Sequence, residues 1–230
     1  MLLETKASLW RARISFLLSN NYLYLLLALS GVLVLWPMLQ PLTMWAGVLE
    51  GLLFLSLWLS IFAASRRPRQ RAIALALATL GVTIRLGWGF LDLPDAYMEF
   101  MYALFFFYAA ALMAIHIFST SEKVNVNMIY GAVSVYMLIG LAFAFVFAGM
   151  AGLSPESFSG LDQGPGARNL FMQTIYFSFV TLSTAGYGDI LPVSDLARPL
   201  AYAEAIAGQL YLTVLVARLV GMHISERIRR

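Results

Sequence analysis

Residues 169–189 read NLFMQTIYFSFVTLSTAGYGD, and this stretch decides how the chain can fold. Asn169 can cap a helix, and residues 170–183 are apolar over the length of about half a membrane. The glycines that follow end the helix, so the backbone becomes non-helical while still at membrane depth. Lipid cannot satisfy the N–H and C=O groups of such a backbone, which is tolerated only where it is buried in protein or lines water. The stretch therefore predicts a pore helix at 169–183 and a re-entrant loop after it.

The composition of the 230-residue chain is that of a membrane protein. Hydrophobic residues make up 61% of the chain and charged residues 12%, and the mean hydropathy is +0.80. So few charges cannot cover the surface of a soluble protein of this size, and they argue against disorder and against nucleic-acid binding. The absence of cysteine excludes disulfides, thiolate metal sites and thiol nucleophiles.

Six apolar windows are long enough to cross about 30 Å of hydrocarbon as helices. They cover residues 22–39, 44–64, 72–91, 97–118, 128–150 and 199–222. We expect an all-α integral membrane fold of six transmembrane helices plus the re-entrant pore helix. The predicted organisation is a cytoplasmic N-terminal segment (1–21), a four-helix domain (22–125), a pore domain (126–222) and a short cytoplasmic tail (223–230).

Basic residues in the predicted loops are distributed unequally between the two sides of the membrane. Two of them, Arg168 and Arg198, share one side, and eleven share the other. Cytoplasmic loops carry the excess of Lys and Arg, so we expect both termini in the cytoplasm and the loop between the last two spans outside. The eleven are Lys6, Arg11, Arg13, Arg66, Arg67, Arg69, Arg71, Lys123, Arg227, Arg229 and Arg230.

The loop after the pore helix alternates glycine with larger residues. Glycine adopts backbone conformations that other L-residues resist, so this pattern permits a strand-like stretch whose carbonyls all point to the same side. Rings of such carbonyls could replace the hydration shell of an ion. The alternative is an ordinary glycine-rich external turn.

Residues 184–189 read TAGYGD and resemble the selectivity filter of potassium channels of the pore-loop superfamily, usually written TVGYGD. The resemblance implies that Thr184 supplies hydroxyl and carbonyl oxygens to K⁺. It also implies that the carbonyls of Ala185, Gly186 and Tyr187 build the ion sites above. K⁺ would be the permeant ion, and no cofactor is expected. The resemblance is strong over 169–222 and is limited to the number of spans before that.

The surroundings of this filter depart from the family pattern. Tyr176 and Phe177 stand where the family commonly has two tryptophans, although Tyr176 can still offer its hydroxyl to Asp189. Ala185 replaces a usual valine, which keeps the carbonyl but removes packing behind it. The residues expected to support the filter are Gly188, which would relax the outer mouth, Asp189, Tyr176, Thr181 and Ser183.

One chain supplies one filter segment, whereas a ring of carbonyls around an axis needs four. The resemblance therefore implies a homotetramer in the lipid bilayer, with the negative ends of the pore helices aimed at a central cavity. A glycine at the place of Gly208 acts as a gate hinge in the family, and close helix packing is the alternative. The residues expected to line the cavity and gate, or else to contact neighbouring subunits, are Gln209, Leu212, Thr213, Val216 and Val220.

Ionisable residues inside the spans are few. Glu50 and Arg85 lie at a matched depth, about 9 Å below the outer boundary at ~1.5 Å per residue, which suggests an intramembrane ion pair or two separately solvated groups. Glu204 either bonds the pore-helix region behind the filter or snorkels outward. His116 is a proton sensor or, more simply, an interfacial histidine, and Arg218 is close enough to the cytoplasmic end to snorkel.

These observations favour a potassium-selective channel without catalytic residues, in the plasma (inner) membrane of a cell that the compact design suggests is bacterial. Span 97–118 carries no Lys or Arg, so steep voltage gating is not expected. A non-selective cation channel would follow if Ala185 left the filter loose. An intramembrane hydrolase would need a serine nucleophile with a partner base, and a transporter would show breaks in both halves.

Overall fold

The computed structural model describes part of the chain as a set of packed helices joined at one end by a small sheet. The described residues are 21–39, 72, 73, 76, 79, 94–119, 126–162 and 167–228. The helices are α2 (Asn21–Leu39), α5 (Ala96–Ser119), α6 (Val126–Leu153), α7 (Ala167–Leu182) and α8 (Ala197–Ile228), with a 3₁₀ turn η2 (Pro155–Ser157) and the strands β1 (Phe158–Ser159) and β2 (Leu191–Pro192).

Three of these helices, α5, α6 and α8, are long and apolar enough to cross a membrane, and they confirm a membrane protein of mainly helical structure. The windows 97–118, 128–150 and 199–222 are thereby confirmed as helices. The window 22–39 is helical as α2. The window 44–64 lies outside the described residues, as does most of 72–91, so six spans stay a prediction.

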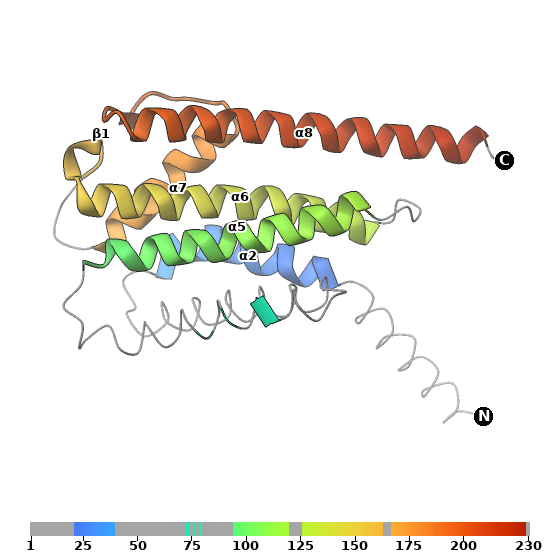
Figure 1. Cartoon of the computed structure of the whole chain (residues 1–230), viewed down its shortest axis with the longest axis horizontal. Coiled ribbons are helices and arrows are strands. Elements are labelled where there is room, and N and C mark those ends of the chain that lie inside the picture. The colour runs from blue at the N-terminus through green and yellow to red at the C-terminus, as the bar shows by residue number, and fades with distance from the viewer. Residues whose placement is uncertain are drawn as a thin grey trace.

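Helix α6 lies at the centre of the fold and contacts each of the other long helices. It contacts α5, α2, α7 and α8, and Figure 1 shows α7 running obliquely across α6 toward α8. Small residues on α6 make this close packing possible, because they let neighbouring side chains approach its backbone.

Three glycines of α6, nine residues apart, each face an aromatic ring from a different helix. A Cβ added at any of them would lie 2.9–3.0 Å from that ring, which is closer than packed atoms come. The sequence alone places these glycines in an apolar run and does not predict the rings that they contact. The three pairs are Gly131 with Tyr22 of α2, Gly140 with Phe179 of α7, and Gly149 with Phe100 of α5.

The two-stranded sheet joins the end of α6 to the segment that follows the filter-like loop. Strands β1 and β2 run antiparallel, with Phe158 opposite Pro192. The N–H of Val193 also donates to the carbonyl of Ser157 at 2.9 Å. The chain is therefore tied together on both sides of α7 and the loop after it.

Candidate functional site

The C-terminal end of α7 is closed by two backbone hydrogen bonds that shape the start of the TAGYGD loop. The N–H of Thr184 donates to the carbonyl of Thr181, and the N–H of Ala185 donates to that of Val180, each at 2.9 Å. Thr184 has a φ of 58°. These bonds and this conformation make a Schellman motif, in which the left-handed position usually belongs to glycine.

The backbone of the loop alternates in hand from residue to residue. Thr184, Gly186 and Gly188 have φ values of 58°, 53° and 79°, whereas Ala185 and Tyr187 do not have a positive φ. Alternation of this kind brings successive carbonyls toward one side, in contrast to a β-strand. The glycine pattern predicted it at 186 and 188, but nothing in the sequence predicted a left-handed threonine.

Thr184 keeps a conformation that is unfavourable for a β-branched residue, and its side chain is held from α8. A positive φ in such a residue costs of the order of 1–3 kcal/mol. The Nε2 of Gln209 donates to the Thr184 hydroxyl oxygen at 3.0 Å. Glycine would adopt the same backbone without strain, so we infer that the chain keeps threonine at this position for its hydroxyl group.

The outer end of the loop is held by Tyr176 of α7. Its hydroxyl donates to the Oδ2 of Asp189 at 2.8 Å, which is the hydrogen bond that the sequence suggested. Its ring is stacked near that of Tyr187, with 6.3 Å between centroids and 15° between planes. Phe177, by contrast, is buried against Phe147 and Phe158, so it braces α7 and the sheet rather than the loop.

The other predicted supports act mainly through the end of α7. Thr181 contributes its carbonyl to the Schellman motif, and the Ser183 hydroxyl donates to the carbonyl of Val180 at 3.3 Å. Residues 183–189 are all exposed on the single chain, with Tyr187 at 73%. The loop therefore lies open on one side of the chain.

Helix α8 presents the predicted lining residues outward and packs Gly208 inward. Gly208 is buried, and a Cβ there would overlap the backbone carbonyl oxygen of Leu182. Helix α8 runs through this position without a break, which favours the close-packing interpretation over a hinge. The outward residues, all exposed, are Gln209, Leu212, Thr213, Val216 and Val220.

Of the two alternatives for Glu204, the structure confirms the first. Glu204 is fully buried and hydrogen-bonded to Ser178 of α7, so it does not snorkel outward. Helix α8 begins at Ala197, two residues before the predicted window 199–222, and the N–H of Ala197 donates to the Ser194 hydroxyl. Pro199 still costs no hydrogen bond, because the first N–H groups of a helix have no partner within it.

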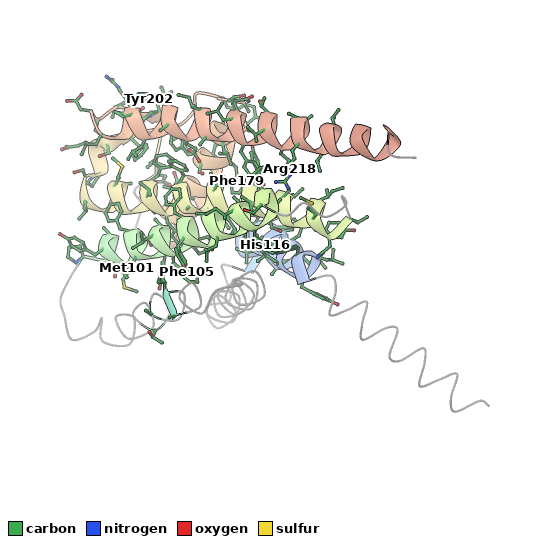
Figure 2. The ribbon with its side chains drawn as sticks, turned by 45° about the vertical axis from the view of Figure 1, so that its right-hand side comes forward. Met101, Phe105, His116, Phe179, Tyr202 and Arg218 are labelled. Atoms are coloured by element: carbon green, nitrogen blue, oxygen red, sulfur yellow. The ribbon has the colours of Figure 1, made fainter. Side chains whose placement is uncertain are left out.

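The remaining polar residues of the spans have local contacts. The Arg218 guanidinium lies 5.3 Å from the centroid of the Phe118 ring, and His116 is half-buried with its ring 6.4 Å from that of Tyr22. In Figure 2 Arg218 points from α8 toward the other helices, while Tyr202 lies on the opposite, outer side. Glu50 and Arg85 lie outside the described residues, so their pairing stays a prediction.

Gly160 holds the loop from the β1 side, a role that the sequence did not reveal. Its φ is +84°, and a Cβ there would overlap the carbonyl oxygen of Asp189. We expect Gly160→Ala to destabilise the protein by about 1–3 kcal/mol through strain and overpacking. The measurement is thermal unfolding in detergent, with Gly31→Ala as control, since its Cβ would have 4.0 Å of room. Equal midpoints for the two variants would contradict this placement.

A helix of half-membrane length, a loop of alternating hand and a following span together have the architecture of an ion-channel pore segment. Residues 139–224 match the model of a family described as ion channel. Over 70 residues, which are 30% of this chain, the sequence is 37% identical to two-pore potassium channel 4 of Arabidopsis thaliana. The match spans 23% of that relative's length. No solved structure matches the chain.

These similarities support an ion channel rather than an enzyme. The family model includes α7, the loop and most of α8, so the segment that resembles a filter falls inside the matched region. The first four predicted spans lie before it.

Proposed function

We propose that four copies of this chain form a potassium-selective channel whose filter is residues 184–187. The observation that carries this proposal is the TAGYGD loop with alternating backbone hand, held directly after a half-membrane helix. The similarity of residues 139–224 to ion channels and the match to a plant potassium channel support it.

In this proposal the carbonyls of residues 184–187 replace the water around K⁺ as it enters. Thr184 adds its hydroxyl oxygen at the innermost site. The bond from Gln209 uses one lone pair of that oxygen and leaves the other for the ion. The Tyr176–Asp189 bond keeps the outer end of the loop in place, so the sites are formed before the ion arrives.

A tetramer explains why α8 and the loop are so open on the single chain. In the apolar window of α8 only 22% of residues are buried, against 67% for α6. The exposed face includes Gln209 and Thr213, and polar side chains at membrane depth normally face a bundle interior or a water-filled cavity. We propose that this face, with Val216 and Val220 below, lines the cavity and gate.

We further propose a multi-pass protein of a bacterial plasma membrane, with both termini in the cytoplasm and with membrane lipids around the tetramer. The excess of Lys and Arg in the loops assigned to the cytoplasm supports this orientation. Residues 126–222 would form the pore domain and residues 22–125 a surrounding domain.

Vesicles that contain the purified full-length protein test the proposed selectivity. We expect rapid K⁺ efflux down its gradient and much slower Na⁺ efflux under the same conditions, because rings of carbonyls replace the hydration shell of K⁺. Equal rates would favour a non-selective cation channel, which a filter loosened at Ala185 would produce.

Voltage dependence should be weak. Moving one charge across the whole field is worth ~2.3 kcal/mol per 100 mV, and steep gating needs three or four such charges per subunit. Helix α5, the fourth predicted span, contains no Lys or Arg. Single-channel recording in symmetric K⁺ without divalent cations, across about ±100 mV, checks this. An open probability that rises e-fold every few millivolts would show that a sensor exists elsewhere in the chain.

A further inference from the structure

A buried carboxyl behind the proposed filter joins three helices through one hydroxyl. Glu204 of α8 and Ser178 of α7 are both fully buried. The Ser178 Oγ lies 2.5 Å from the Glu204 Oε1 and 2.6 Å from the carbonyl oxygen of Gly140 on α6. Three elements of the proposed pore therefore meet at a single side chain of the pore helix.

Counting protons at this junction indicates which form Glu204 takes. The hydroxyl of Ser178 carries one hydrogen, and the carbonyl of Gly140 can only accept. If Ser178 donates to Gly140, the short contact with Glu204 requires a proton on the carboxyl, which donates to the Ser178 oxygen. If Glu204 were ionised, Ser178 would donate to it, and two oxygen atoms 2.6 Å apart would have no hydrogen between them.

The surroundings also favour the neutral form. In the described structure the Glu204 Oε2 is buried without a hydrogen-bond partner. Helix α6 has no acidic or basic residue, and its tyrosine close enough to interact electrostatically with Glu204 is Tyr136. In α7 the titratable residue from 170 to 182 is Tyr176, whose hydroxyl donates to Asp189.

The basic residues of α8 within its described side chains are directed elsewhere. The Nε of Arg198 donates to the carbonyl of Pro192 at 3.4 Å, and Arg218 lies over Phe118. No cation in the described part of the chain therefore compensates a charge on Glu204, and an unpaired buried carboxylate is strongly unfavourable.

We propose that Glu204 is a positioning residue held as a neutral acid, and that the relay from its O–H through Ser178 to the Gly140 carbonyl fixes the pore helix against α6 and α8. One turn beyond Ser178, the carbonyl of Leu182 meets Gly208, so α8 holds α7 at two successive points. Loss of the proton at alkaline pH places an uncompensated charge at the junction and loosens the pore helix. The expected change in K⁺ flux rests on the proposed channel function, whereas the protonation and the contacts of Glu204 do not.

The test uses full-length protein in lipid vesicles and two independent readouts. Infrared difference spectra of wild type against Glu204→Gln, at neutral pH, should contain the carbonyl band of a protonated carboxyl. Ser178→Ala should shift that band, because it removes the acceptor of the carboxyl proton. Raising the pH should remove the band and lower K⁺ flux in the wild type, whereas Glu204→Gln should keep its flux, since an amide N–H can replace the acid as donor.

Glu204→Leu separates positioning from simple space filling. It has similar volume but no donor, so we expect about a tenfold lower flux than Glu204→Gln. The absence of a carboxyl band, or wild-type flux in Glu204→Leu, would overturn the inference. If the wild type carries no K⁺ flux, the proposed function fails, and the infrared band with its shift in Ser178→Ala still decides the state of Glu204.

Discussion

Gly186→Ala should abolish potassium flux while leaving the chain folded. Gly186 has a φ of +53°, and a Cβ there would meet nothing within 4 Å on the chain. The effect of alanine is thus conformational, because the left-handed backbone costs an L-residue about 1–2 kcal/mol. With four copies around one axis the cost sums to about 4–8 kcal/mol, which the loop avoids by turning carbonyls away from the ion path. The measurement is K⁺ efflux from vesicles.

Gly221→Ala is the matched control for this variant. Gly221 lies in α8, also has nothing within 4 Å of an added Cβ, and does not need a positive φ. It should conduct like the wild type. Unchanged flux in Gly186→Ala would remove residues 184–187 from the role of filter.

Gly208→Ala should lower both flux and stability. The added Cβ would overlap the backbone carbonyl of Leu182, at the end of the pore helix, so α8 must move away from α7. Overpacking of this kind costs about 1–3 kcal/mol in each subunit. Because the obstacle is backbone, Leu182→Ala should not rescue the variant. Flux assays and thermal unfolding of the same preparation provide the measurement.

The two interpretations of Gly208 predict different results for this variant. A hinge glycine that is not closely packed would change the open probability and leave the unfolding midpoint where it was. A closely packed glycine lowers the midpoint together with the flux, and Gly31→Ala, which has room for a Cβ, should change neither. A lower flux with an unaltered midpoint would therefore speak for the hinge.

Local pattern predicted the elements of the site well. The helices at 97–118, 128–150 and 199–222 follow from apolar length, and α7 ends one residue before the predicted bound of 183. The hydrogen bond between Tyr176 and Asp189 was predicted from the resemblance of this segment to the potassium-channel filter. Each of these depends on residues close together in the sequence.

Contacts between distant residues were not predictable in the same way. Thr184 was expected to supply oxygens, but its left-handed backbone arises from the cap on α7, where propensity favours glycine. The bond from Gln209, the fit of Gly160 against Asp189 and the burial of Glu204 depend on how α8 and the sheet pack around α7. A sequence pattern predicts which face of a helix is buried, but it does not predict which atoms of another element that face contacts.

Selective conduction of potassium is tested most directly by reversal potentials of the purified full-length protein in a planar bilayer, with K⁺ and Na⁺ varied independently on the two sides. The proposed filter predicts that the reversal potential shifts by about 59 mV for each tenfold change in the K⁺ gradient and is insensitive to the Na⁺ gradient. A reversal potential that follows the two gradients equally would contradict a potassium-selective filter at residues 184–187.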